Sequence, residues 1–199
     1  KNNHMILYQI KSILRRLMPR FLIGWYHLSL AFLGAFLCCF PARKLIVIGV
    51  TGTKGKSTIV EFCHKILQEK GYRVASLSSI RFKINEEESP NKTKMTMPGR
   101  FTIQTFLKKA VKSGCKYAVV EVTSEGILQY RHRFLNFDTA VFSNLKPEHI
   151  ERHGNFENYK KAKEQLFKIT KNIHIVNLDD ETLQILKVVV FIQLLVMQF

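Results

Sequence analysis

The feature that most constrains the fold is a glycine-rich loop between a strand-like segment and a helix-like segment. Residues 45–50 are a short β-branched run that predicts a buried strand. An amphipathic run follows the loop, with apolar residues on one helical face at Ile59, Val60, Cys63, Ile66 and Leu67. Glycines let the backbone approach an anion, and the amides and dipole at a helix start favour negative charge. The loop, residues 52–58, therefore predicts a phosphate cradle.

Two side chains of this loop have positions suited to nucleotide and metal. Lys56 would reach the terminal phosphates, and Ser57 would hold Mg²⁺. The strict G-x-x-x-x-G-K-[ST] pattern is not met, because Val50 occupies the place of its first glycine. A plain glycine turn with a solvated lysine is the alternative. The residues predicted to bind ATP here are Gly52, Thr53, Lys54, Gly55, Lys56, Ser57 and Thr58.

From residue 45 onwards, predicted strands and helices alternate. Strands are predicted at residues 72–78, 117–122, 139–143 and 173–177, with helices that start near Thr102 and Asn155. This alternation predicts an α/β fold of the P-loop type, a mostly parallel sheet with helices on both faces. Residues 80–100 are polar and rich in turn signals, so they predict a long loop. Residues 188–199 could form a strand or a helix, or come from a shifted reading frame.

The N-terminal part has a different composition, which divides the chain into residues 1–42 and a domain of residues 43–199. Residues 5–20 alternate basic and apolar side chains, a pattern typical of a helix that lies on an anionic membrane. Residues 21–40 carry no charge and predict a hydrophobic helix. That helix is just long enough to span a bilayer, or it packs on the domain or on a partner.

The charge and the cysteine content of the chain indicate which kind of partner it binds and which cellular compartment it occupies. The 31 basic and 15 acidic residues give a net charge of +16, which favours anionic partners. No aromatic–basic stacking motif accompanies this charge, so nucleic acid is not an expected partner. The four cysteines form no C-x-x-C pair, which fits a cytoplasmic protein, with attachment to the inner face of the cytoplasmic membrane as a further expectation.

Two ionisable residues have unusual positions for purely structural groups. Glu121 ends an apolar strand, where a carboxylate is a candidate Mg²⁺ ligand or a salt-bridge partner at the sheet edge. Lys163 lies on the apolar face of a predicted helix, where it is either a paired or modified amine or a lysine at the helix edge. His149 and His153 taken alone are more typical of surface or packing residues.

Five segments, in this order and spacing, together resemble the Mur ligase family. They are residues 51–58, 121–131, 142–154, 157–167 and 177–180, and the resemblance covers residues 43–181. It is strongest to the UDP-N-acetylmuramyl-tripeptide synthetase type. The family's enzymes use ATP to join an amino acid to a UDP-muramyl carboxylate in peptidoglycan synthesis.

The resemblance implies roles for individual residues. Lys56, Lys163 and His149 would be catalytic, and ATP and Mg²⁺ would be the cofactors. The expected metal ligands are Ser57, Glu121, His149 and a carbamylated Lys163. Asn144 and Asn177 match nucleotide contacts. Thr96, Thr123, Gln129 and Arg131 match contacts to the UDP-sugar substrate, although Met97 replaces a usual hydroxyl residue.

The sequence also departs from the family pattern. Glu125 stands where the family has a histidine, and residues 1–42 replace the UDP-binding domain. The C-terminal domain that would bind the amino acid is missing, so this chain alone is not expected to complete the ligation. A folylpolyglutamate- or cyanophycin-synthetase-like ligase is the alternative enzyme. A membrane-attached nucleotide-binding module without catalysis is a second alternative, and a nucleic-acid binder ranks last.

Overall fold

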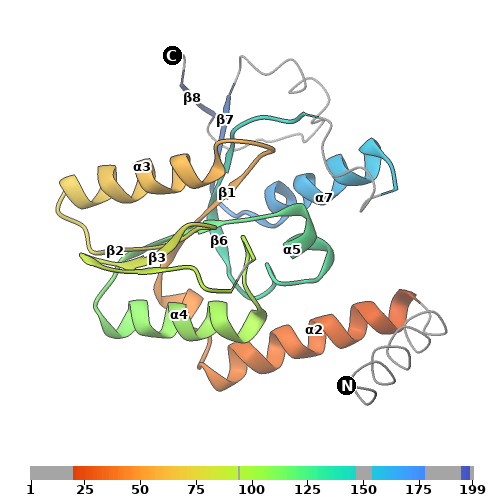
Figure 1. Cartoon of the computed structure of the whole chain (residues 1–199), viewed down its shortest axis with the longest axis horizontal. Coiled ribbons are helices and arrows are strands. Elements are labelled where there is room, and N and C mark those ends of the chain that lie inside the picture. Colours follow the sequence, from red (N-terminus) through yellow and green to blue (C-terminus); the bar gives the residue numbers. More distant parts are fainter. Residues whose placement is uncertain (1–19, 94, 147–153, 178–193, 198–199) are drawn as a thin grey trace, which may run out of the picture.

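The computed structural model describes residues 20–93, 95–146, 154–177 and 194–197 (Figure 1). Its centre is an eight-stranded sheet of order β4-β3-β2-β5-β1-β6-β7-β8. The strands are β1 (Ile46–Thr51), β2 (Val74–Leu77), β3 (Arg81–Ile84), β4 (Glu87–Pro90), β5 (Tyr117–Glu121), β6 (Phe137–Phe142), β7 (Ile173–Asn177) and β8 (Leu194–Met197). Only the pairs β2–β3 and β3–β4 are antiparallel. The predicted α/β class with a mostly parallel sheet is confirmed.

Helices cover both faces of this sheet, as predicted. In Figure 1, α3 (Lys56–Glu69) lies on one side, while α4 (Arg100–Lys112) and α7 (Phe156–Ile169) lie on the other. The residues of β5 divide between the two cores, because Ala118 and Val120 join the α4–α7 side and Val119 joins the α3 side. A strand buried on both faces needs apolar residues at every position.

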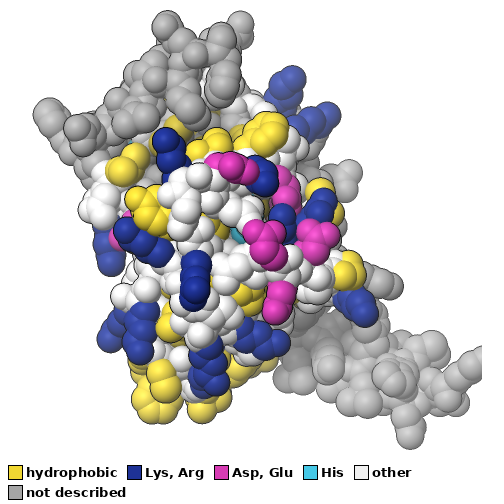
Figure 2. Space-filling model, turned by 90° about the vertical axis from the view of Figure 1, so that its left-hand side faces the viewer, with side chains coloured by type: hydrophobic (Ala, Val, Ile, Leu, Met, Phe, Trp, Pro, Cys, Tyr) yellow, Lys and Arg dark blue, Asp and Glu magenta, His cyan; other side chains and the backbone are white. Residues whose placement is uncertain are grey.

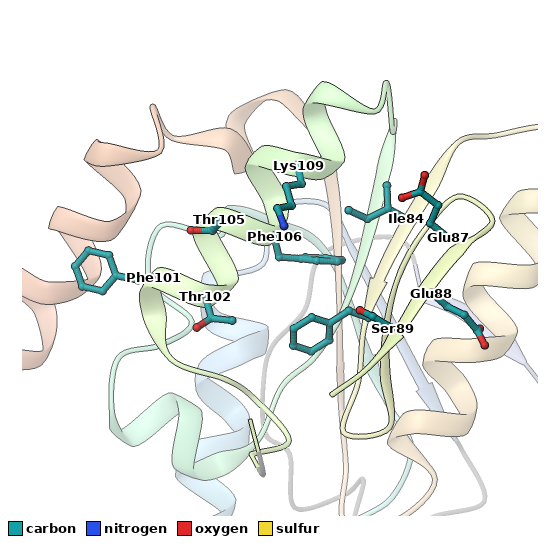
Figure 3. Close-up of a pocket in the computed structure, with 10 residues that line it drawn as sticks. Ile84, Glu87, Glu88, Ser89, Phe101, Thr102, Thr105, Phe106 and Lys109 are labelled. Carbon is teal, nitrogen blue, oxygen red and sulfur yellow. The ribbon is translucent and has the colours of Figure 1, made fainter. Parts of the chain in front are cut away.

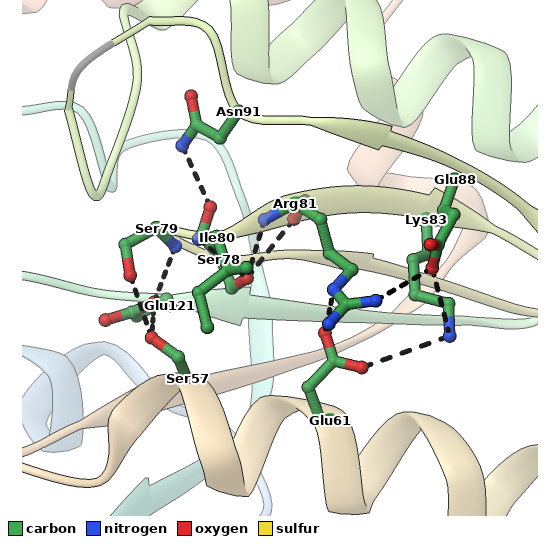
Figure 4. Close-up of polar contacts among 10 residues, drawn as sticks. All are labelled: Ser57, Glu61, Ser78, Ser79, Ile80, Arg81, Lys83, Glu88, Asn91 and Glu121. Carbon is green, nitrogen blue, oxygen red and sulfur yellow. Dashed lines mark hydrogen bonds and ion pairs between the residues drawn. The ribbon is translucent and has the colours of Figure 1, made fainter.

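The prediction of a long loop over residues 80–100 is wrong in its first half. This part forms a hairpin of β3 and β4, closed by a two-residue turn at Asn85–Glu86 in which Asn85 has a φ of 54°. Phe82 and Ile84 of β3 pack against the core, and charged pairs lie among the alternate residues. This alternation covers only one four-residue strand, and β4 is exposed throughout, so the hairpin was not predicted. Arg81 lies 3.0 Å from Glu88 and 3.4 Å from Glu61 of α3 (Figure 4).

The remaining element boundaries agree with the sequence to within a few residues. Asn155 caps α7 as predicted, since its side chain accepts the Asn158 amide at 2.8 Å. By contrast, α4 begins at Arg100 after Gly99, so Thr102 is not its cap. A short helix, α5 (Ser124–Leu128), was not predicted. Within residues 188–199, a strand is found at Leu194–Met197.

The hydrophobic N-terminal segment forms α2 (Arg20–Leu37), followed by the 3-10 turn η1 (Pro41–Lys44). Small residues face α4: Ala31 and Ala35 are buried, and a Cβ added at Gly34 would lie 3.6 Å from Phe101. Figure 3 shows Phe101 directed from α4 toward this helix. Across the described ranges, no helix is long and apolar enough to cross a membrane. Of the two alternatives for residues 21–40, the packed helix is the one observed.

Candidate functional site

The glycine loop joins β1 to α3 with a backbone that only glycine accommodates. Gly52 has a φ of 152°, and a Cβ at this position would lie 1.8 Å from the Ser143 hydroxyl oxygen. Gly55 caps α3 with a φ of 78°. The first amides of an α-helix have no acceptor within the helix itself, which suits the start of α3 to an anion. The loop therefore has the strand–glycine–helix arrangement that was predicted, and its binding of phosphate stays a prediction.

Ser143 and Asn144, which follow β6, form hydrogen bonds with this loop. Asn144 Oδ1 accepts the amides of Thr53 at 3.2 Å and Lys54 at 2.9 Å, and its Nδ2 donates to the Lys54 carbonyl at 3.1 Å. Ser143 Oγ donates to the same carbonyl at 2.8 Å. Two amides predicted to meet ATP are thus bound to Asn144 in this structure. Because these two amides are occupied, we expect the first turn of α3 to make the phosphate contacts. A contact between Asn144 and the nucleotide stays a prediction.

The buried carboxylate of Glu121 lies beside Ser57, the second residue of α3. Ser57 Oγ donates to Glu121 Oε2 at 2.9 Å, the Ser79 amide donates to the same oxygen at 2.8 Å, and the two serine hydroxyls are 2.8 Å apart (Figure 4). Glu121 is only 2% exposed. In the described residues, no group of three His, Cys, Asp or Glu gathers around one point. Mg²⁺ needs only one or two protein oxygens when phosphate and water complete its shell, so Ser57 and Glu121 fit it.

Lys163 is buried on the inner face of α7, as its helical position predicted. Its exposed fraction is 3%, and its Nζ donates to the Gly52 carbonyl at 2.5 Å and lies 4.7 Å from the centre of the Tyr159 ring. The Tyr159 hydroxyl is 3.1 Å from Thr53 Oγ1. Helix α7 therefore brings a cation directly against the glycine loop.

One cavity joins the phosphate loop to the predicted substrate segments. Its volume is about 180 Å³, and it is lined by Gly52, Thr53, Lys56, Thr96, Thr123, Ser124, Glu125, Tyr159 and Lys163. Lys56 Nζ donates to the Thr53 carbonyl at 2.8 Å, so it bends back over the loop. The cavity has room for a phosphoryl group and a carboxylate rather than for a whole nucleotide sugar.

Among the described residues, Gln129, Arg131 and Asn177 do not line this cavity. Arg131 donates from Nε and Nη2 to Gln129 Oε1, at 3.2 and 2.6 Å, and from Nη1 to the Met97 carbonyl. The Met97 side chain is buried, which explains an apolar residue at a position where the family has a hydroxyl. Asn177 Nδ2 donates to the Ser143 carbonyl at 3.3 Å. His149 lies outside the described residues.

His132 adds no charge beside Arg131 at neutral pH. The pKa of His132 is lowered from 6.5 to about 4, first by burial and then by the nearby charge of Arg133, against a smaller opposing hydrogen bond to the Gly126 backbone. The imidazole is therefore neutral, and the positive charge at this turn is that of the guanidinium.

A second hollow lies between α4 and the β3–β4 hairpin (Figure 3). Its volume is about 510 Å³, and its walls include Phe82, Ile84 and Phe106. None of the predicted site residues lines it. The smaller cavity at the glycine loop is therefore the candidate site.

Several residues of this site were not predicted to act there, among them Ser79, Ser143 and Tyr159. Ser79 follows β2, Ser143 precedes Asn144, and Tyr159 lies on the same helix as Lys163. The first two lie at the carboxyl ends of parallel strands, where ligands gather, and this position was a usable signal. The contact of Tyr159 with Thr53 depends on how α7 packs.

A family model described as the Mur ligase middle domain matches residues 50–191. The chain belongs to this family. A UDP-N-acetylmuramoyl-L-alanyl-D-glutamate--2,6-diaminopimelate ligase of Parabacteroides distasonis is 39% identical over 127 residues, which are 64% of this chain and 26% of the relative. A UDP-N-acetylmuramyl-tripeptide synthetase of Treponema pallidum is 38% identical over 131 residues, 65% of this chain and 24% of the relative. The chain thus spans about a quarter of the length of these curated relatives.

Solved structures agree with this Mur ligase assignment. A UDP-N-acetylmuramoyl-L-alanyl-D-glutamate--2,6-diaminopimelate ligase superposes with a TM-score of 0.63 at 31% identity, covering 71% of this chain and 28% of that one. The E. coli FolC complex with DHPP and ADP has a TM-score of 0.58 at 18% identity, covering 77% of this chain and 43% of that one. The second likeness shows a shared fold only. The sequence relatives therefore favour the Mur type over the folylpolyglutamate alternative.

Proposed function

We propose that this Mur ligase chain is the nucleotide- and acid-binding part of an ATP-dependent ligase that forms an amide bond on a UDP-muramyl-peptide carboxylate. The observation that carries the proposal is the shared cavity. Lys56 of the phosphate loop and Lys163 of α7 line it together with Thr96 and Thr123 of the predicted substrate segments. A phosphate donor and a carboxylate acceptor would meet there.

The chemistry follows from these groups. In the first step, a carboxylate oxygen attacks the γ-phosphorus of ATP and ADP leaves, which gives an acyl phosphate. The amine of an amino acid then attacks the acyl carbon, phosphate leaves, and the amine loses a proton. Lys56 would neutralise negative charge that moves between oxygens during transfer. The loop amides would hold the phosphates still while this occurs.

Ser57 and Glu121 are the residues proposed to hold Mg²⁺, which would supply charge neutralisation on the phosphates. His149 as a second metal ligand remains part of this proposal. Lys163 as observed is an amine that donates to the Gly52 carbonyl. Carbamylation would convert it into an oxygen ligand, and the burial of this amine against the loop supports that role.

Removing the carboxylate tests the metal site. We expect Glu121→Gln to abolish the Mg²⁺ dependence of ATP binding, lowering affinity about tenfold in Mg²⁺, because an amide oxygen without charge is a weak Mg²⁺ ligand. Isothermal calorimetry with ATP, in Mg²⁺ and in EDTA, measures this. Glu69→Gln is the matched control, since Glu69 is an exposed carboxylate at the far end of α3. Mg²⁺-dependent binding that is equal in both variants would contradict the assignment.

A second candidate function is attachment to a membrane, and the composition of α2 favours it. Its small residues face the domain, whereas its large apolar residues point outward, with Trp25 at 69% and Phe36 at 58% exposure. Figure 2 shows hydrophobic side chains along the lower edge, the side on which α2 lies in Figure 1, and Lys and Arg side chains above them. Residues 1–44 carry seven Lys or Arg and no acid. We infer that this face docks on an anionic lipid surface.

Vesicle flotation tests this docking. We expect binding to phosphatidylglycerol vesicles to fall at least about fivefold in the double variant Trp25→Ser and Phe36→Ser, since burying each side chain contributes about 1.5–3 kcal/mol. Phe62→Ser is the control, because Phe62 is equally exposed on α3. Absence of flotation, flotation that the control alters equally, or a dimer that the double variant dissociates would overturn the lipid assignment.

A further inference from the structure

A separate cavity lies at the far end of α3. This helix runs from the glycine loop to the turn before β2, and the cavity opens beside that turn (Figure 1). Its volume is about 500 Å³, within the usual range of small-molecule sites. Of the described residues predicted to bind ATP, Mg²⁺ or the acid substrate, none lines it. We call it the His64 cavity, and its walls include His64, Gln68, Tyr72, Arg73, Asn85 and Glu86.

The His64 cavity has a buried imidazole on its wall. His64 is 1% exposed, and neither Nδ1 nor Nε2 has a hydrogen-bond partner within the described part of the chain. Burial is the main cause that lowers the pKa of His64, and the charge of Lys83 lowers it further. The nearby Asn85 backbone and two carboxylates, Glu61 and Glu86, oppose this shift. The ring is therefore neutral at pH 7, with one N–H donor and one acceptor nitrogen, and a ligand that pairs them would remove the cost of burying them unpaired.

The rim of the cavity carries one charge of each sign. Arg73 is exposed and forms no salt bridge with another described residue, and its guanidinium extends over Gly114, where an added Cβ would lie 2.8 Å from Nη1. Glu86 accepts a hydrogen bond from Gln68 Nε2, which holds its carboxylate at the cavity. A free guanidinium, a carboxylate and a neutral imidazole thus share one cavity. Their charges complement a small molecule that is itself both anion and cation.

We propose that the His64 cavity binds a free α-amino acid whose side chain ends in a neutral polar group such as an amide. Arg73 would bind the α-carboxylate, because a guanidinium forms paired hydrogen bonds with carboxylate oxygens. Glu86 would bind the α-ammonium, and His64 would pair with the polar end of the side chain. The site goes beyond the proposed function, since it adjoins Val74 at the start of β2, whereas the glycine loop follows the end of the parallel strand β1.

Calorimetric titration with L-glutamine and two analogues tests the site. 4-Aminobutanamide lacks the carboxylate of L-glutamine, and glutaramate lacks its ammonium group. We expect each analogue to bind at least about tenfold more weakly, because each loses a hydrogen bond between charged groups. Failure of the unaltered chain to bind L-glutamine, or equal binding of either analogue, would overturn the proposal.

Two substitutions assign the charges of the ligand to their partners. Arg73→Gln should weaken L-glutamine at least about tenfold and leave 4-aminobutanamide unaffected, while Glu86→Gln should weaken L-glutamine similarly and leave glutaramate unaffected. Arg133→Gln and Glu87→Gln are the matched controls, since both residues are exposed and neither lines the cavity. Losses of L-glutamine affinity that the controls reproduce would contradict the assignment.

His64→Leu separates ligand binding from a structural role. We expect it to weaken L-glutamine at least about fivefold and to leave Tm unchanged or higher, because an unpaired buried imidazole does not stabilise the fold. L-glutamine affinity equal to that of the unaltered chain would overturn the role of His64. If this variant does not fold, nuclear magnetic resonance of the unaltered chain decides, since L-glutamine should shift the ring signals of His64 and not those of His174, which is also buried without a partner among the described residues. Equal shifts would refute the site. Lys56→Ala should bind L-glutamine normally, so failure here and failure of the phosphate loop are distinguishable.

Discussion

Replacing Lys56 with alanine is expected to weaken ATP binding about 100-fold. The lysine lines the cavity, and its Nζ reaches over the loop to the Thr53 carbonyl at 2.8 Å, where a terminal phosphate would replace that carbonyl as partner. A hydrogen bond between charged groups contributes about 1.5–3 kcal/mol, and 2.7 kcal/mol corresponds to about 100-fold. Calorimetry with Mg²⁺ and ATP on residues 41–199 and on the full chain measures the change.

Lys65→Ala is the matched control, because Lys65 lies on the same helix, is 67% exposed and pairs with Glu69 at 3.0 Å. Its loss should leave ATP affinity within twofold. Circular dichroism establishes that both variants are folded. Should Lys56→Ala bind ATP as tightly as the control, the loop would not be the phosphate site. The non-catalytic alternative would then become the leading one.

Gly52→Ala is expected to lower the free energy of unfolding by about 3 kcal/mol and to abolish ATP binding. A Cβ at this position would overlap the Ser143 hydroxyl oxygen at 1.8 Å, and the φ of 152° is itself unfavourable for alanine. To relieve the overlap, Ser143 must give up its hydrogen bond to the Lys54 carbonyl, which helps hold the loop. Urea unfolding followed by circular dichroism, together with calorimetry, measures both effects.

Gly71→Ala separates backbone strain from the overlap. Gly71 has a φ of 82° with no atom within 4 Å of an added Cβ, so its loss should cost about 1 kcal/mol and leave ATP binding intact. Removing the hydroxyl in the double variant Gly52→Ala and Ser143→Ala should recover part of the stability lost by Gly52→Ala. Equal destabilisation by the two glycine substitutions would show that Ser143 does not constrain the loop.

Much of the site was readable from sequence because it depends on local spacing. The strand, the glycines and Lys56–Ser57 are consecutive, so one stretch of chain defines the phosphate cradle. Glu121 was found because a charge at the end of an apolar strand is conspicuous. Lys163 was found because helical periodicity places it on the buried face, where the structure has it.

The hairpin at residues 81–90 and the hydrogen bond between Arg100 and His27 were not readable in this way. Phe82 and Ile84 of the hairpin pack on the core, and Arg81 pairs with Glu88 and with Glu61 of α3. Arg100 and His27 are 73 positions apart, and only the packing of α2 on α4 brings them together. No local pattern encodes such contacts.

The sequence by itself determined the α/β class, the phosphate loop and the residues that end the central strands. These features follow from hydrophobic periodicity and from backbone constraints over a few neighbouring residues. Only the tertiary structure decided that Asn144 holds the loop, that Lys163 donates to the Gly52 carbonyl, and that Thr96 and Thr123 line the same cavity as the loop. Those contacts join distant segments, and their geometry depends on how helices pack on the sheet, which a linear pattern does not specify.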